Sequence, residues 1–486
     1  MTYDLIIIGG GINGAAIARE AALSGLKVLL AEKDDLASHT SSASTKLIHG
    51  GLRYLEYYEF RLVREALQER ERLMRLAPHL IHPLQFVLPH INAPRPWLLV
   101  RLGLWMYDRL GGKSSLPRSR ALRAADTMLR MPLKGEPGGF AYSDGWVDDS
   151  RFVVLNAMDA ARHGADIRTR CGVTAAKRVK GVWAVTLANG ETVSARALVN
   201  AAGPWVADMA KQCGIDAKAG VRLVKGSHII VEQLFAGEQA YMLQQPDGRI
   251  VFAIPYLEGL TLIGTTDVPV TSPDKAKISR KEIDYLCEAA NRYFKRSIAP
   301  ADVVATYSGI RPLYDDGASD AKAVTRDYVL ELDTNGPPVL SVYGGKITTA
   351  RHLATRAMAK LAPALGISIA PDNRIEPYSG GNLPLPFPEF LQRVREFWPF
   401  LGEQRSRRMA SAYGTLLSNI MEGVTCESDM GFQFGGGLTQ KEVDWLINRE
   451  WARTPADILE RRTKLGLMTG PETETALAHY MEGLLP

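Results

Sequence analysis

The sequence predicts an α/β protein with three parts: a domain built on a parallel sheet, a second domain on a mixed or antiparallel sheet, and an all-α C-terminal domain. Three observations support this prediction. An apolar run near the N-terminus ends in closely spaced glycines and leads into an alanine-rich helical stretch, as a βαβ unit does. Two later tracts are rich in alternating apolar and polar residues around short turn signals. Beyond about residue 370, prolines and glycines are followed by helical patterns.

The composition is that of a folded protein with more than one domain. The 486 residues exceed what one hydrophobic core usually organises, and 46% hydrophobic with 23% charged residues argues against long disordered stretches. The net charge of +5 is small and the basic residues are spread along the chain, which does not indicate a nucleic-acid partner. The four cysteines lie far apart without metal-site spacing, so we expect free thiols in a reducing compartment and no metal site.

The N-terminal segment has the features of a dinucleotide-binding unit. An apolar strand is predicted at residues 5–8, an alanine-rich helix follows it, and a second strand is predicted at 27–31. Glu32 then stands where an acidic side chain would meet a ribose hydroxyl and repel a 2′-phosphate, which argues against NADP. Three glycines between strand and helix allow a tight turn, close approach of a pyrophosphate and close helix packing: Gly9, Gly11 and Gly14.

Two later segments favour FAD over NAD as the dinucleotide. Residues 195–205, ARALVNAAGPW, and residues 341–354, SVYGGKITTARHLA, each run from an apolar strand into small residues. Open α/β sheets bind ligands at the carboxyl ends of their strands, and a long cofactor needs contacts from several such ends. Tight strand-to-helix turns alone would explain either segment taken singly.

The motifs together resemble a known family. They run in order from residue 5 to about 354: IIIGGGINGAAIA, TSSASTKLIHGGLRYLE, YSDGWVDDSR, LVNAAGPWV, RLVKGSHIIV, IGTTDV, YSGIRPL, AVTRDY and SVYGGKITTARHLA. In these stretches the chain is similar to the FAD-dependent glycerol-3-phosphate dehydrogenases, within a larger group that includes D-amino acid and glycine oxidases. The resemblance implies a Rossmann-like FAD-binding domain and oxidation of glycerol 3-phosphate to dihydroxyacetone phosphate.

The resemblance also implies which residues hold the cofactor. Short hydroxyl side chains would crowd against the ribitol and pyrophosphate, and paired glycines would let backbone pass beneath the flat ring. With the N-terminal glycines and Glu32, the expected cofactor-binding residues are Ser41, Ser42, Ser44, Thr45, Lys46, Gly50, Gly51, Ala202, Gly203, Gly345, Lys346, Ile347 and Thr348.

The substrate requires a cation cluster for its phosphate and a base for its hydroxyl proton. His228 is the leading candidate for the base and His49 the second, while a structural histidine explains either one equally well. The resemblance places Arg311 beside the reacting carbinol, where a guanidinium would stabilise a forming alkoxide. The expected phosphate-binding residues are Arg53, Tyr54, Arg326 and Lys346.

The resemblance implies that electrons pass to a membrane quinone, with oxygen as the alternative acceptor. The sequence contains no second nucleotide site, iron–sulfur cysteines or haem motif. Residues 94–110, PRPWLLVRLGLWMYDRL, are apolar and aromatic with interspersed arginines, which is typical of an interfacial helix; a buried helix of the substrate domain explains the same pattern. No run of about 18 apolar residues and no secretory leader is found, so we expect a peripheral enzyme on the cytoplasmic side of the inner membrane.

Two other functions remain open from the sequence. One is an amine or amino-acid oxidase of the same fold, which would not need phosphate-binding cations. The other is a flavin-containing module without turnover. Whether the chain forms a homo-oligomer also stays open.

The predicted domains are discontinuous. The FAD-binding domain is expected at residues 1–75, 141–220 and 305–370, the substrate domain at 76–140 and 221–304, and the helical domain at 371–486. Asn189-Gly190 and Asp247-Gly248 predict tight turns between strands. In the C-terminal part, Thr439 with Glu442 has capping-box spacing, and Thr454-Pro455 is predicted to begin a further helix.

Overall fold

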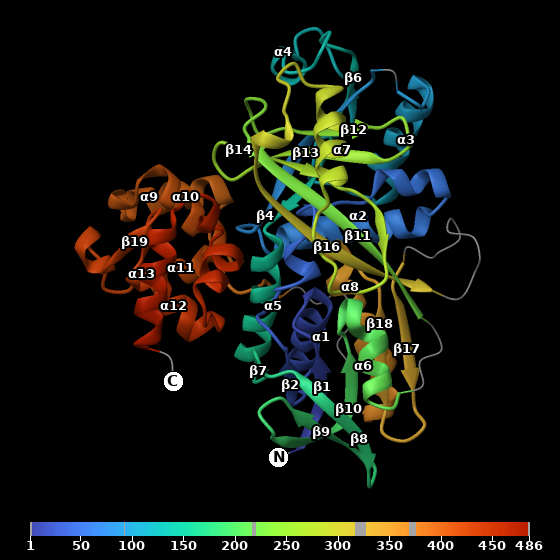
Figure 1. Cartoon of the computed structure of the whole chain (residues 1–486), viewed down its shortest axis with the longest axis vertical. Coiled ribbons are helices and arrows are strands. Elements are labelled where there is room, and N and C mark those ends of the chain that lie inside the picture. The colour runs from blue at the N-terminus through green and yellow to red at the C-terminus, as the bar shows by residue number, and fades with distance from the viewer. Residues whose placement is uncertain (1, 92, 216–219, 316–326, 369–375, 485–486) are drawn as a thin grey trace.

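The computed structural model describes residues 2–91, 93–215, 220–315, 327–368 and 376–484. These residues form two large sheets, one above the other in Figure 1, with a separate helical unit at their side. The predicted fold class is confirmed by this arrangement. Helix α5 (Asp149–Arg162) lies between the lower sheet and the helical unit.

The first sheet is the Rossmann-like part of the molecule. Its parallel centre pairs strands in the order β18, β10, β1, β2 and β7, and β17 joins β18 in the antiparallel sense. Helices α1 (Ile12–Leu23), α5 and α8 (Ala350–Leu365) share a buried apolar core with one face of this sheet. The opposite face packs against α6 (Val206–Gln212) and a hairpin. The strands are β1 (Thr2–Ile8), β2 (Val28–Ala31), β7 (Asp166–Arg168), β8 (Val173–Val179), β9 (Val182–Leu187), β10 (Thr192–Asn200), β17 (Val329–Asp333) and β18 (Val339–Tyr343).

The second sheet has ten strands and is mixed, since β4 and β12 pair in parallel while its other pairings are antiparallel. Its longest pairing joins β11 to β16. The strands are β3 (Leu47–Ile48), β4 (Ile81–Pro89), β5 (Arg120–Ala121), β6 (Gly139–Val147), β11 (Gly220–Glu232), β12 (Ala240–Gln244), β13 (Ile250–Tyr256), β14 (Leu260–Gly264), β15 (Val268–Val270) and β16 (Val303–Asp315).

Four helices surround this second sheet. They are α2 (Phe60–Leu76), α3 (Trp97–Leu110), α4 (Thr127–Arg130) and α7 (Arg280–Asn291). Both predicted turns are confirmed: Asn189-Gly190 connects β9 to β10, and Asp247-Gly248 connects β12 to β13. The domain boundaries themselves stay a prediction. Strand pairing adds that β6 and β16 hydrogen-bond within the second sheet, although most of their residues fall in ranges expected for the FAD-binding domain.

The C-terminal unit has its own apolar core and is helical, as expected. Its helices are α9 (Phe387–Phe397), α10 (Gly402–Tyr413), α11 (Leu417–Ile420), α12 (Gln440–Glu450), a π-helical segment (Asp457–Arg462) and α13 (Pro471–Glu482), with a two-stranded ladder of β19 (Gln433–Gly435) and β20 (Leu438–Thr439).

The start of α12 follows Thr439 as predicted, but the capping box is wrong. The Thr439 hydroxyl makes no cap. The Glu442 carboxylate instead accepts two hydrogen bonds from Arg408, at 2.6 and 2.7 Å, and one from the Tyr413 hydroxyl at 2.6 Å. Because Glu442 is fully buried, an ion pair compensates its charge better than a backbone amide would. The helical turns after Thr454-Pro455 are present as expected.

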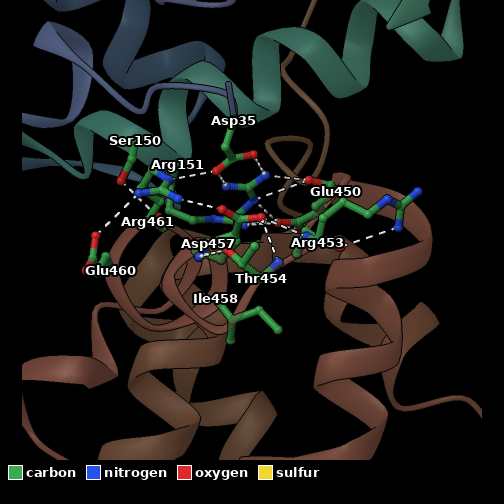
Figure 2. Close-up of polar contacts among 12 residues, drawn as sticks. Asp35, Ser150, Arg151, Glu450, Arg453, Thr454, Asp457, Ile458, Glu460 and Arg461 are labelled. Carbon is green, nitrogen blue, oxygen red and sulfur yellow. Dashed lines mark hydrogen bonds and ion pairs between the residues drawn. The ribbon is translucent and has the colours of Figure 1, made fainter. Parts of the chain in front are cut away.

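A buried ionic cluster joins the C-terminal unit to the first sheet (Figure 2). Asp35, in the loop after β2, accepts two hydrogen bonds from Arg462, at 2.7 and 2.8 Å, and one from Arg461 at 2.7 Å. Arg151 on α5 pairs with Glu450 at the end of α12. The junction is therefore held by ion pairs removed from water, and loss of one partner would leave the other charge buried without its compensation.

Candidate active site

The turn between β1 and α1 has the geometry of a pyrophosphate-binding turn. Gly9 has φ +106°, and a Cβ there would lie 2.6 Å from the Ala201 carbonyl oxygen. A Cβ on Gly14 would lie 1.9 Å from the Gly9 carbonyl oxygen, so only glycine lets the helix pack this closely. Gly11, the N-cap residue of α1, has no side chain to cap the helix; Ser41 Oγ accepts the Ile12 amide, and the amides that follow it in the first turn are left for an anion.

The acidic residue after β2 lies where the motif predicts it. Glu32 is 6% exposed and accepts hydrogen bonds from the Gly10 amide at 2.6 Å and the Asp34 amide at 2.9 Å. Burial raises the pKa of Glu32, although those two amides oppose the shift. These amides orient the carboxylate at the edge of the groove that leads from the glycine turn.

The same groove continues over two further strand ends. Ala202 and Gly203, after β10, line it together with Trp205, whose ring contacts the His39 ring at a centroid distance of 4.6 Å. Gly344 and Gly345 line it from the end of β18.

The glycine pair after β18 meets the first turn of α1. Gly345 has φ +99°, and a Cβ there would lie 2.7 Å from the Asn13 side chain. Asn13 Nδ2 donates to the Gly344 carbonyl at 2.9 Å, while its buried Oδ1 has no hydrogen-bond partner among the described residues. Backbone at three strand ends and one orphan acceptor fit a long dinucleotide such as FAD.

The hydroxyl-rich segment 41–46 is divided between groove and protein interior. Ser41 Oγ accepts the Ile12 amide at 2.9 Å and lines the groove. The Ser42 hydroxyl donates to the His39 carbonyl at 3.1 Å, and the Ser44 hydroxyl donates to Asp149 at 2.8 Å.

Lys46 points into the interior rather than to solvent. Its side chain is 1% exposed and its Nζ lies 2.8 and 2.9 Å from the two carboxylate oxygens of Asp149. Burial lowers the pKa of Lys46 while the Asp149 carboxylate opposes this shift. The ion pair between Lys46 and Asp149 thus anchors the backbone of this segment to α5.

His228, on β11 of the second sheet, lies against this segment. His228 Nε2 lies 3.0 Å from Thr45 Oγ1, its ring stacks on Tyr307 with centroids 4.8 Å apart, and its buried Nδ1 has no partner among the described residues. A Cβ on Gly264, which pairs with His228 across the strands, would lie 2.0 Å from the imidazole. Gly264 therefore leaves the space that the ring occupies.

The surroundings of both candidate histidines favour the neutral imidazole. Burial, together with the charges of Lys46 and Arg311, lowers the pKa of His228 well below its usual value. Burial also lowers the pKa of His49; the Asp144 carboxylate opposes this shift and the Lys346 charge adds to it. A neutral imidazole can accept a proton, so both retain the protonation state that a base requires.

The predicted cations come from different segments, and two of them act on the histidines: Lys346 on His49 and Arg311 on His228. Lys346 Nζ lies 4.1 Å from the centroid of the Tyr54 ring. Arg53 has a buried Nε without a partner among the described residues, which suits an anionic ligand. Arg311 pairs with Asp267 at 2.9 Å and donates to the Thr266 carbonyl at 3.0 Å. Arg326 lies outside the described residues.

The family is decided by comparison with known proteins. Residues 4–351 match the family described as FAD dependent oxidoreductase. The chain belongs to the FAD-dependent oxidoreductases. Residues 376–484 match the family described as the C-terminal domain of alpha-glycerophosphate oxidase, and FAD is the cofactor.

Relatives match this oxidoreductase from end to end. A glycerol-3-phosphate dehydrogenase of Pseudomonas aeruginosa is 48% identical and covers 100% of this chain and 96% of its own length. A D-erythritol 1-phosphate dehydrogenase of Brucella abortus is also 48% identical, over 95% of this chain and 94% of its own. The structure of a glycerol-3-phosphate dehydrogenase from Bacillus halodurans complexed with FAD aligns with a TM-score of 0.75 at 27% identity, over 99% of this chain and 89% of that one. The resemblance inferred from the motifs is confirmed.

Several residues of this oxidoreductase that shape the site were not expected from the sequence. Asn13 and Asp149 contact the predicted segments from far along the chain, and Tyr107 reaches the loop at Gly50. Asp149 lies in the motif YSDGWVDDSR, where an acidic pair stands at the start of a helix. That pair signals a helix N-terminus, and Asp148 does cap α5 by accepting the Arg151 amide, but it does not reveal the partner of Asp149.

Proposed function

We propose that this oxidoreductase converts sn-glycerol 3-phosphate to dihydroxyacetone phosphate. The observation that carries the proposal is the combination of a buried neutral imidazole with cations from three separate segments. The Arg311 charge contributes to the lowered pKa of His228, and the Lys346 charge contributes to the lowered pKa of His49. His49 and His228 are linked through the second sheet, because the His49 ring lies edge-on to Phe252 at 6.4 Å and Phe252 pairs with Gly264 beside His228.

Each side chain of the site has a separate role in the proposed reaction. When bound, FAD would supply the acceptor for the hydride that leaves the carbinol carbon. His228 takes the hydroxyl proton on a ring nitrogen, and Arg311 stabilises the negative charge that develops on the oxygen. Arg53, Tyr54 and Lys346 hold the phosphate end, and we assign Arg326 to the same task from outside the described residues.

An anaerobic titration tests this function. Addition of sn-glycerol 3-phosphate to the yellow holoprotein should bleach the flavin absorbance, and His228→Ala should slow bleaching by about 10²- to 10⁴-fold while substrate still binds. His163→Ala is the matched control, since His163 lies at the C-terminal end of α5 and pairs with Glu376 at 3.2 Å. Failure of the wild-type protein to bleach would refute the function, and normal bleaching in His228→Ala would remove that residue from the mechanism.

A second substrate is favoured by one comparison. The relative named D-erythritol 1-phosphate dehydrogenase is as similar in identity, 48%, as the glycerol-3-phosphate dehydrogenase of Pseudomonas aeruginosa. Both substrates place a phosphate ester and a secondary alcohol on a short polyol, so the same cations and base would serve. The ratio of kcat/KM for the two compounds decides between them.

We assign the electrons to a membrane quinone, with oxygen as the alternative acceptor. A cavity of about 350 Å³ is lined mainly by apolar side chains of α3, the 3₁₀ segment Leu52–Tyr57 and the second sheet, and Arg53 is among its lining residues. An apolar cavity bordering a predicted substrate residue suits a quinone ring better than a second charged metabolite. Turnover with a soluble quinone but not with oxygen alone would support this acceptor; hydrogen peroxide formation at the same rate would contradict it.

The same helix suggests how the protein meets a membrane. No helix in the described ranges is long and apolar enough to cross a bilayer. One face of α3 is buried through Val100, Leu104 and Tyr107, so the expectation of a buried helix holds for that face. Its other face exposes four apolar side chains, by 46 to 79%: Leu98, Leu99, Leu102 and Trp105.

We propose peripheral attachment through this outer face of α3, on the cytoplasmic side of the inner membrane. An exposed apolar stripe on an otherwise packed helix suits insertion among lipid headgroups. Flotation with anionic vesicles should be lost in a Leu98→Glu, Leu102→Glu variant and kept in a Met128→Glu control, which alters an exposed residue on α4. Equal flotation of both variants would contradict the assignment.

The amine-oxidase alternative is disfavoured by the cation cluster. A Lys346→Ala, Arg326→Ala double variant should lose turnover of the phosphate ester. Retained activity toward an amino acid would instead support that alternative, and a flavin that no substrate bleaches would support a module without turnover.

A further inference from the structure

A buried tyrosine contacts the backbone of the proposed active-site loop. The Gly50 amide donates a hydrogen bond to Tyr107 Oη at 2.8 Å. Tyr107 is 3% exposed and lies on the inner face of α3, 57 residues further along the chain. A Cβ at Gly50 would lie 2.8 Å from that hydroxyl and 2.6 Å from the Leu67 side chain, so a larger residue would displace one of them.

The direction of this hydrogen bond is set by a buried carboxylate. Tyr107 Oη lies 2.8 and 3.0 Å from the two oxygens of Asp144, which is 2% exposed and paired with Arg70 at 2.7 Å. Burial and the Asp144 charge raise the pKa of Tyr107 well above its usual value, so its hydroxyl remains protonated. A protonated hydroxyl donates to the carboxylate, and its lone pair is then directed to the Gly50 amide.

Gly50 connects the two groups of proposed site residues. On one side, the His49 amide donates to Thr348 Oγ1 at 3.2 Å. On the other side, Gly51 has φ +74° and leads into the 3₁₀ segment that carries Arg53 and Tyr54. The backbone at Gly50 therefore determines both where His49 lies and where the phosphate-binding side chains begin.

We propose that Tyr107, oriented by Asp144, is a positioning residue for this loop. The inference rests on the proposed function. Tyr107 acts on the loop through the hydrogen bond that its hydroxyl accepts from the Gly50 amide. Without the hydroxyl, that amide is buried without an acceptor, and the loop relaxes to satisfy it elsewhere. Both the proton-accepting and the phosphate-binding groups then move relative to the bound FAD.

Tyr107→Phe in the holoprotein tests this inference, with Tyr142→Phe as the matched control. Tyr142 is buried in the same apolar cluster at 4% exposure, but its hydroxyl contacts only Met242 Sδ, at 3.3 Å, among the described residues. Hydrogen exchange measured by mass spectrometry should be faster in peptides covering residues 47–58 of Tyr107→Phe and unchanged in Tyr142→Phe. Flavin reduction should slow by about 10- to 100-fold in Tyr107→Phe, with a raised KM for the phosphate ester.

Two outcomes would overturn the inference. One is wild-type exchange and wild-type kinetics in Tyr107→Phe. The other is an equal loss in both variants, which would indicate general loosening of the core. If wild-type protein is not reduced by the phosphate ester, the proposed function fails, whereas the exchange comparison still decides whether Tyr107 holds the loop. Asp144→Asn provides a second variant, and it should accelerate exchange in the same peptides because the tyrosine hydroxyl loses its charged acceptor.

Discussion

Asp35→Asn should weaken the junction between the first sheet and the C-terminal unit. The Asp35 and Arg462 side chains are 1% and 0% exposed, and the carboxylate accepts two hydrogen bonds from Arg462 and one from Arg461. The substitution keeps the shape of the side chain but leaves the buried Arg462 guanidinium with only the Glu450 carboxylate, 3.9 Å from its Nε and already paired with Arg151, as a counter-charge. Breaking a buried pair in this way costs about 3–5 kcal/mol. Arg461 keeps Asp457 at its other end, so we expect a value of about 3 kcal/mol.

Urea unfolding of the holoprotein at neutral pH measures this loss. Tryptophan fluorescence follows the chain, and flavin fluorescence follows release of FAD, which should occur earlier because Asp35 lies three residues beyond Glu32. Asp284→Asn is the control: its partner Arg280 is 74% exposed, and such a pair contributes less than about 1 kcal/mol. A loss below about 1 kcal/mol in Asp35→Asn, equal to that of the control, would refute the reasoning.

Three further predictions concern the histidines and the phosphate end. Burial lowers the pKa of His79 to about 3, so the stability associated with its neutral form is fully present above the unfolded pKa of about 6.5 and is lost as pH falls toward 3. Urea unfolding between pH 6.5 and 4 should therefore show a smaller decline in His79→Phe than in the wild-type protein, and identical slopes would contradict this. Gly264→Ala should displace the His228 ring and slow flavin reduction by about 10²-fold, whereas Gly259→Ala, which strains a turn at φ +75° but meets no neighbouring atom, should leave the rate unchanged. Lys346→Gln should raise KM for the phosphate ester by about 10-fold, measured by steady-state kinetics, and an unchanged KM would exclude Lys346 from the phosphate end.

The local part of the site was predictable from the sequence, and the long-range part was not. The glycine turn, Glu32 and both tight turns follow from spacing, because each depends on residues within one supersecondary unit. The side chains of Ser44 and Lys46 were expected at the cofactor, yet both bond to Asp149, more than 100 residues away. A carboxylate buried on α5 attracts the nearest cation and hydroxyl whatever their local pattern predicts.

The same distinction explains the capping-box error and the unforeseen tyrosine. Thr439 with Glu442 has the right spacing, but Arg408 on a neighbouring helix competes for the carboxylate. The pattern of residues around Tyr107 predicts only one more buried residue of an amphipathic helix. Nothing in that segment indicates that the Gly50 amide is its partner. Hydrogen bonds between distant segments depend on tertiary packing, and a single sequence does not show which distant residues meet.

The cofactor groove is assembled from strand ends that are distant in sequence, and this has a consequence for biosynthesis. Gly9 and Glu32 leave the ribosome early, Ala202 follows much later, and Gly344 and Gly345 complete the groove only after two thirds of the chain has been made. Strand β18 must pair beside β10 before those last glycines are in place. FAD capture is therefore a late event in synthesis, so a nascent chain stalled before β18 should emerge colourless while one released after α8 should acquire its yellow prosthetic group.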